Sequence, residues 1–337
     1  MQGPHTLRSA LWALLAIVVF AATVLAQAQT DPGTPPAPEA AVSDQKAGSV
    51  LFYNLYTSSS SNCDSENTRI NITNTNYSQS IAVHIFFVEG ASCSPADSFL
   101  CLTPNQTMSF LAYDMDPGVM GFIVAVAVDR NGIPINFNYL IGDEFVKLAS
   151  GHMANLGAEA FTAIQPNPAV VMNAEALLLF NDWHYVRAPR VLALDNIPSP
   201  GDGNNTILIL NRFGGDLSTG GRWVGNIAGA LYNDQENAFS FSFSGKCQVK
   251  QQLTNSFPRT APNLSSVIQS GHSGWMRFWS TGAPDSTAVG IAAPGLLGAV
   301  LNCGEQSNPH VFRQGHNLHK LTFCDEGYFL PIIPPPC

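Results

Sequence analysis

The sequence predicts an all-β fold: two tandem antiparallel β-sandwich (immunoglobulin-like) domains, related by duplication, behind a cleaved signal peptide. Three observations predict it. Short segments with a hydrophobic period of two recur along the chain, Gly, Asn, Ser and Pro separate them, and the first 28 residues resemble a secretory leader in composition.

The leader is the most specific feature. Arg8 precedes an apolar run over residues 10–25, and Ala26-Gln27-Ala28 then places small residues two apart, as signal peptidase requires. We therefore expect a signal peptide at 1–28. Residues 29–47 include the tract DPGTPPAP, which favours an extended polyproline conformation, so we expect a Pro-rich flexible lead there. No later apolar run reaches the roughly 18 residues that span a bilayer, so no transmembrane segment is expected in the mature chain.

The first β-sandwich is expected at 48–148. Its predicted strands cover residues 50–56, 68–73, 81–88, 108–113 and 122–128. In the third, Ile81, Val83 and Ile85 alternate with other residues, as in a strand with two different faces. Asn131-Gly132 predicts a type I′ hairpin turn between strands at 122–128 and 133–140.

Residues 149–189 are expected to form a connector, 190–305 the second β-sandwich and 306–337 a C-terminal tail that runs over the surface. Within the connector, 169–179 is apolar on nearly all sides and is consistent with either a buried helix or a strand.

Four features recur in order at an offset of about 140 to 155 residues. Residues 190–196 resemble 49–55, 205–211 resemble 67–73, the alternating Phe and Ser before Cys247 resemble 81–88 before Cys93, and 274–279 resemble 121–126. This offset is longer than a solenoid repeat and predicts a duplicated domain. The alternative is chance, because short strands have few distinguishable patterns.

The charge balance argues against a nucleic-acid partner. The formal net charge is -9, and charged residues make up 12% of the chain, against roughly 25% in typical soluble proteins. Phosphate backbones are bound by clustered Lys and Arg, and no such cluster occurs.

Seven cysteines lie beyond the leader, and an oxidising compartment would make disulfides their default state. Proximity in sequence favours Cys93 with Cys101, and then Cys324 with Cys337. An odd count leaves at least one thiol unpaired. No C-x-x-C pair occurs, which weakens a structural zinc site as an explanation.

His310, His316 and His319 are the strongest candidates for metal binding, with Glu305 or Asp325 as an added ligand. Their spacing matches no established ligand pattern, so surface histidines are the favoured interpretation and no metal or cofactor is assigned.

No catalytic residue is assigned either. Residues 270–274 approach a Gly-x-Ser-x-Gly elbow but lack its first glycine. Carboxylates that could hydrolyse a sugar are scattered, and their separation is unknown. They are Asp143, Glu144, Asp182, Asp195 and Glu236.

Two Asp-containing loops, around Asp114-Met115-Asp116 and Asp202-Gly203-Asn204-Asn205, are expected to form turns rather than calcium sites. Five Asn-x-Ser/Thr triplets are possible glycan acceptors, to which no function is attached: they begin at Asn71, Asn76, Asn105, Asn204 and Asn263. Aromatic side chains could stack on sugars, although tryptophan in a core is the favoured interpretation. Those considered are Trp183, His184, Tyr185, Trp223, Trp275 and Trp279.

Together these features predict a secreted, non-catalytic cell-envelope or extracellular protein with a structural, adhesive or partner-binding role. Its partner would be a protein or glycan at the cell surface. Low charge, rigid sandwiches and disulfides suit that setting. The alternative is a secreted hydrolase acting on polysaccharide or peptide, and a metal-binding envelope protein is third.

Overall fold

The computed structural model describes residues 41–282, 294–304 and 313–337. Val42–Cys337 forms one compact unit. The predicted signal peptide, 1–28, and most of the predicted lead lie outside the described residues. Residues 41–47 of that lead are packed rather than free, since Val42 is 3% exposed and the Ser43 N–H donates to the Ala160 carbonyl. Within the described residues, packing thus already includes Val42, which lies before the predicted domain start at residue 48.

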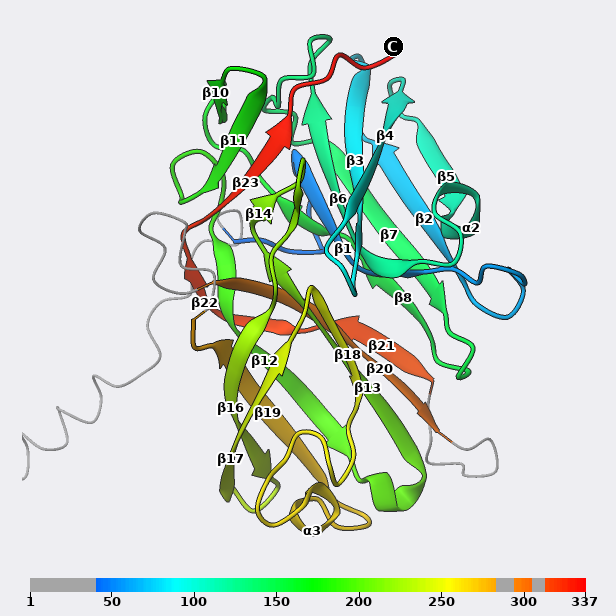
Figure 1. The fold of residues 1–337 in the computed structure, drawn as a ribbon, viewed down its shortest axis with the longest axis vertical. Coiled ribbons are helices and arrows are strands. Elements are labelled where there is room, and N and C mark those ends of the chain that lie inside the picture. The colour runs from blue at the N-terminus through cyan, green and yellow to red at the C-terminus, as the bar shows by residue number, and fades with distance from the viewer. Residues whose placement is uncertain (1–40, 283–293, 305–312) are drawn as a thin grey trace, which may run out of the picture. The chain divides into compact units, whose positions relative to one another are not determined.

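The described chain is all-β, as predicted (Figure 1). Its helical elements are the one-turn helices α2 (Ala112–Met115) and α3 (Leu264–Val267) and the 3₁₀ turn η3 (Pro200–Asp202). The strands form five small sheets, which we name A to E and give in the order of their hydrogen-bonded neighbours.

Sheet A contains β4 (Pro95–Leu102), β3 (Ile81–Glu89), β6 (Met120–Val128), β1 (Val50–Thr57) and β9 (Glu159–Phe161). Sheet B contains β5 (Thr107–Leu111), β2 (Asn67–Asn74), β7 (Leu140–Lys147) and β8 (Met153–Gly157). Sheet C contains β10 (Ala169–Met172), β11 (Glu175–Phe180), β23 (Glu326–Pro331), β14 (Gly215–Asp216) and β15 (Gly220–Gly221).

Sheet D contains β17 (Ala238–Gly245), β16 (Gly225–Asn233), β19 (Ser273–Ser280), β12 (Ala188–Pro198) and β22 (His319–Cys324). Sheet E contains β18 (Gln248–Gln252), β13 (Asn204–Phe213), β20 (Gly295–Gly304) and β21 (Gln314–Asn317). Pairing within the sheets is antiparallel except between β14 and β23.

Four apolar clusters connect the sheets. One fills the space between sheets A and B, with Leu51, Ile70 and Ile85 among its members, and another lies between sheets D and E, with Leu208 and Met276. A third packs sheet C against the opposite face of sheet A, and a fourth packs sheet B against sheet E. Sheet A is therefore covered on both faces, which explains why β1 is buried at every position and has a nearly continuous apolar sequence.

The prediction of two tandem immunoglobulin-like sandwiches is wrong in the number of sheets and in how they pack. Five sheets share their faces, whereas two separate sandwiches would have four sheets and two independent cores. The added sheet C takes β10, β11 and β23 from the predicted connector and tail, and β14 and β15 from the predicted second sandwich. Strands β11 and β23 pair along their whole lengths (Figure 1). A short stretch of sequence cannot reveal this strand pairing, because the paired residues lie about 150 positions apart in the chain.

The predicted connector and tail both contribute strands to the sheets. In the connector, β8 and β9 join sheets B and A, and 169–179 forms the hairpin strands β10 and β11 rather than a helix. The predicted surface tail supplies β21, β22 and β23 to three different sheets, and its Leu318, Tyr328 and Leu330 are each at most 1% exposed.

The predicted strand at 133–140 is absent from the described structure. The Asp129 carboxylate accepts hydrogen bonds from the N–H groups of Asn131 and Ile133, and Gly132 has a φ of 83°. A turn is present, but Asn131 is not among the residues with positive φ, so it is not the predicted type I′. Beyond the turn only an isolated bridge joins Val128 to Pro134, which has no N–H to extend a ladder.

Both predicted disulfides are wrong. The structure pairs Cys93 with Cys247 and Cys101 with Cys337, and leaves Cys63, Cys303 and Cys324 as thiols. Each bond joins residues more than 150 positions apart in sequence. Proximity in sequence therefore did not predict these bonds, because the fold brings distant segments of the chain together.

Among the described residues, no helix has the length and apolarity that crossing a bilayer requires.

Candidate functional site

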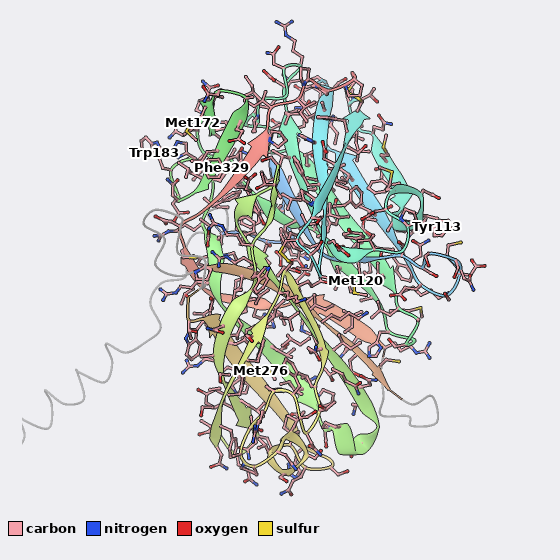
Figure 2. The ribbon with its side chains drawn as sticks, viewed as in Figure 1. Tyr113, Met120, Met172, Trp183, Met276 and Phe329 are labelled. Carbon is pink, nitrogen blue, oxygen red and sulfur yellow. A yellow bond between two sulfur atoms is a disulfide. The ribbon has the colours of Figure 1, made fainter. Side chains whose placement is uncertain are left out.

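The outer face of sheet D is the most distinctive polar and aromatic surface of the described chain. Along β19, Met276 and Phe278 are fully buried, whereas Trp275 is 38% exposed and Arg277 is also exposed. Figure 2 shows Met276 among the side chains of this part of the fold. A period of two in the sequence thus separates an apolar inner face from an outer face that carries Trp275, Arg277 and Trp279.

Trp275 stacks on Tyr232 of the neighbouring strand. The two residues are direct cross-strand partners, with ring centroids 4.4 Å apart and an interplanar angle of 9°. The Arg277 guanidinium lies 5.8 Å from the centroid of the Tyr232 ring. Such contacts contribute roughly 0.5–1.5 kcal/mol each and hold the side chains in one orientation.

Small side chains surround these rings. Ala230 and Ala228 of β16 lie opposite Arg277 and Trp279, and beyond them β17 presents Ser240 and Ser242. On the other side, β12 presents Ala193 beside Arg277. We call the outward side chains of this region the aromatic face. Its members are Tyr232, Trp275, Arg277, Trp279, Ser240 and Ser242.

The aromatic face has the chemistry of a surface for flat polar ligands. Aromatic rings stack on the C–H faces of sugars, while a guanidinium and hydroxyl groups donate hydrogen bonds to ring oxygens and hydroxyls. Because the neighbouring Ala and Ser side chains are small, they leave a flat surface on which a chain-like ligand could lie across several strands.

The tryptophans differ from the core positions that the sequence favoured. Trp183 is 63% exposed, Trp223 47% and Trp275 38%, while Tyr185 is completely buried. Figure 2 shows Trp183 at the periphery of the fold, near sheet C. Core packing was the wrong expectation for these three tryptophans. Trp275 lies on the outward face of β19, where strand register decides which side is exposed, and Trp183 and Trp223 lie outside the strands.

Asp195, His316 and His319 come together beside the aromatic face. The Nε2 atoms of His316 and His319 lie 2.9 and 3.3 Å from Asp195 Oδ1. Partial burial acts to raise the pKa of Asp195. Hydrogen bonds and positive charge from the two histidines outweigh it, so the pKa of Asp195 lies below its ordinary value. The sequence paired these histidines with His310, Glu305 or Asp325 instead. His310 and Glu305 lie outside the described residues, and Asp325 binds Arg187 at 2.7 Å.

At the near-miss of a nucleophile elbow, no hydrogen bond joins His272 to Ser273 or to Ser270 in the described part of the chain. Ser270 donates to Asp202, whereas the neighbouring His272 pairs with a different carboxylate, Asp234. The histidine and the serine are thus each bonded to a different acid, instead of to one another. Gly271 also donates its N–H to Asp202 Oδ2 at 2.8 Å. This ties the Asp202 loop, which contains the 3₁₀ turn η3, to the loop before β19.

The scattered carboxylates lie on different elements. Asp143 and Glu144 are adjacent on β7 and point to opposite faces, Asp182 follows β11, and Glu236 occupies a turn at a φ of 64°. Glu144 is 1% exposed, and burial raises its pKa well above the ordinary value. It accepts the Leu55 N–H at 3.0 Å, which gives it a structural partner. Asp116 likewise accepts the Tyr56 hydroxyl proton at 2.7 Å.

A separate hollow of about 820 Å³ lies between the two halves of the chain. Glu89 and Met120 from sheet A line one side, and Lys246, Lys250 and Phe257 line the other. None of the sequence candidates for catalysis lines it.

No family model and no curated protein matches the sequence. Among solved structures, the chain is similar to Thermotoga maritima 1070, with 11% identity and a TM-score of 0.26 over 36% of this chain and 97% of that one. It is also similar to oxalate decarboxylase from Lactobacillus farciminis, with 7% identity and a TM-score of 0.15 over 82% and 75% of the two chains. For a mutant of the Bacillus subtilis enzyme the values are 8% and 0.16, over 83% and 68%. Likenesses this weak carry no argument about fold or activity.

Proposed function

We propose that this chain is an exported, non-catalytic binding protein that recognises a glycan through the aromatic face. The observation that carries this proposal is the stack of Trp275 on Tyr232, with Arg277 beside it, on an open sheet surface. Contiguous exposed apolar patches mark binding sites more often than single exposed residues do, and the stack joins the partly exposed Trp275 to Tyr232 in one such patch.

Export is supported by the predicted leader and by the two disulfides, because such bonds persist in oxidising compartments. A non-catalytic role is supported by the separate partners of Ser270 and His272 and by the structural partner of Glu144.

We also propose that the chain contains a duplication. Sheets A and D have matching strand orders, as do sheets B and E, when β1 is equated with β12 and β2 with β13. Both β1 and β12 have a break in pairing at the same place, between Tyr53 and Tyr56 and between Leu194 and Ile197. The Phe and Ser strand, however, takes the place of β4 rather than that of β3 suggested by its sequence.

A glycan array followed by titration tests the proposed recognition. We expect one class of polysaccharide to bind, and we expect Trp275→Ala to weaken that binding by at least about tenfold, roughly the free energy of one lost aromatic contact. Trp183→Ala is the matched control, because Trp183 is more exposed and lies outside the aromatic face.

Equal loss in both variants, or no loss in either, would count against this surface. Protein ligands are the other outcome: capture of a peptide or protein with the glycan array blank would replace the glycan by a protein partner. Release of sugar products by the purified chain would contradict the non-catalytic role and favour the hydrolase alternative.

A further inference from the structure

The segment that carries His316 and His319 passes from sheet E to sheet D through two buried residues. His316 belongs to β21 in sheet E and His319 to β22 in sheet D, with Asn317 and Leu318 between them. Leu318 is 1% exposed. Asn317 Nδ2 donates to Asp44 Oδ2 at 2.9 Å and to the Gly157 carbonyl at 2.7 Å. The two imidazoles are therefore held at either end of a rigid, buried dipeptide.

Asp195 reaches the same point from β12. It lies in the interruption of the β12–β19 pairing, next to Asn196, whose φ is 42°. An extra residue in a ladder redirects its side chain, and such bulges occur often beside functional sites. In the matching break of β1, Asn54 lies instead in the interior and donates to Asn317 at 2.9 Å. The position thus carries a buried amide in one half and an exposed carboxylate in the other.

The three donor atoms are close enough to share one ion. They lie within 4.8 Å of one another, and both imidazole nitrogens already lie 2.9–3.3 Å from the same carboxylate oxygen. Ligands at about 2.0–2.2 Å from zinc are separated by roughly 3–4 Å in tetrahedral geometry. Shifts of about an ångström or less in exposed side chains would admit the ion.

From this geometry we infer that Asp195, His316 and His319 form a binding site for a divalent first-row transition metal ion of the zinc class. Two imidazoles and one carboxylate suit Zn²⁺, Cu²⁺ or Ni²⁺, whereas Ca²⁺ and Mg²⁺ prefer oxygen ligands. The side chains are 54%, 40% and 56% exposed, so a fourth position remains open to water or to an oxygen of a bound partner.

The site and the aromatic face share a row of sheet D. Ala193 of β12 pairs with His319 on one side and with Arg277 on the other. Neighbouring strands are about 4.8 Å apart, which places the backbone of the metal site about 10 Å from that of Arg277. The inference itself does not depend on the glycan proposal, because its evidence is the ligand geometry alone.

Isothermal titration of the mature protein with ZnCl₂ tests the site, using protein prepared without a histidine tag. We expect one ion per chain, and we expect His316→Gln and His319→Gln each to weaken binding by at least about tenfold. Glutamine keeps a hydrogen-bond donor for Asp195, which limits structural damage. His272→Gln is the matched control, since His272 also pairs with an aspartate but has no second histidine beside it.

A readout that needs no variant accompanies the titration. Zinc should protect His316 and His319, but not His272, from modification by diethylpyrocarbonate, as measured by peptide mass spectrometry. The inference is overturned if the wild-type protein binds zinc no more tightly than about 100 µM. It is equally overturned if the variant with both histidines replaced binds as the wild type does, or if zinc leaves the two histidines unprotected.

Discussion

Cys93 is bonded to Cys247 across 154 residues, with a Cα–Cα distance of 5.3 Å. Cys93 lies in the turn between β3 and β4, and Cys247 lies between β17 and β18. The bond therefore connects a hairpin of sheet A with the short connection that leads from sheet D to sheet E. It closes a long loop, which is the arrangement in which a crosslink restricts the unfolded chain most.

Replacing both cysteines by alanine should destabilise the protein substantially. The chain-entropy model gives about 5 kcal/mol for a loop of this length. Denaturant unfolding followed by tryptophan fluorescence measures the loss. Cys63→Ala, which removes a thiol rather than a disulfide, is the control and should stay within about 0.5 kcal/mol of wild type. A loss below about 1 kcal/mol in the double variant would mean that the bond does not form.

The three thiols should differ in reactivity. Burial raises the pKa of Cys324 to about 12, and the nearby Glu326 acts in the same direction. Because the thiolate is the reacting species, iodoacetamide should label Cys324 at least about tenfold more slowly than Cys63 in the folded protein. Labelling in denaturant is the control, where the rates should converge. The same peptide maps should recover Cys93–Cys247 and Cys101–Cys337, and a Cys93–Cys101 peptide would refute the observed pairing.

The buried carboxyl of Glu159 should make stability fall with rising pH. Burial raises its pKa to about 7 although Lys320 Nζ lies 2.7 Å away and opposes the shift. The folded state thus holds this proton more tightly than the unfolded state, whose carboxyl titrates near 4.5. Its contribution is complete below about pH 4.5 and is lost as the pH rises to about 7, amounting to at most about 3 kcal/mol.

Unfolding midpoints of wild type and Glu159→Gln across pH 4 to 8 test this effect. The difference between the two curves isolates Glu159 from other groups that titrate in the same range. We expect the variant to lose less stability between pH 4.5 and 7. Glu175→Gln, at an exposed position, shows whether a Glu-to-Gln change alone flattens the curve. Parallel curves for wild type and Glu159→Gln would contradict the shift.

A network of buried amide side chains joins sheet A to sheet E, and Asn211 is central to it. Asn211 is fully buried, and its Nδ2 donates to the Asn54 carbonyl at 2.8 Å. Its Oδ1 accepts from Gln248 Nε2 at 2.9 Å. Asn211→Ala would leave both partners short of a hydrogen bond in a closed interior, which should cost about 2–4 kcal/mol of unfolding free energy.

Chemical denaturation of Asn211→Ala beside Asn226→Ala measures that cost. Asn226 is exposed on β16, and its replacement should change stability by less than about 0.5 kcal/mol. If both variants unfold at the wild-type midpoint, the amide network contributes nothing to the free energy of unfolding.

Local pattern in the sequence predicted the strands that alternate or are apolar throughout. The segments at 50–56, 68–73, 81–88 and 122–128 lie within β1, β2, β3 and β6, because side-chain period is a local property. It missed β4, whose Pro95-Ala96-Asp97-Ser98 start has low strand propensity and is held by pairing with β3. Pairing with a strong neighbour overrode local preference there.

The candidate site could be predicted only in its parts. The sequence singled out Trp275, Trp279, His316 and His319, but it placed the tryptophans in the core and did not point to Asp195 as the acidic partner of the histidines. Asp195 is more than 120 residues from either histidine. Only the pairing of β12 with β22, and the bulge that turns Asp195, bring them together.

By itself, the sequence determined that this chain is all-β, weakly charged and built from short strands, since composition and side-chain period depend on neighbouring residues. The tertiary structure alone decided which cysteines meet, that a fifth sheet covers sheet A, and that the tryptophans face outward beside a histidine and aspartate cluster. These features depend on contacts between segments that are far apart in the sequence. Closing such loops is decided by the free energy of the whole fold, which no short stretch of sequence records.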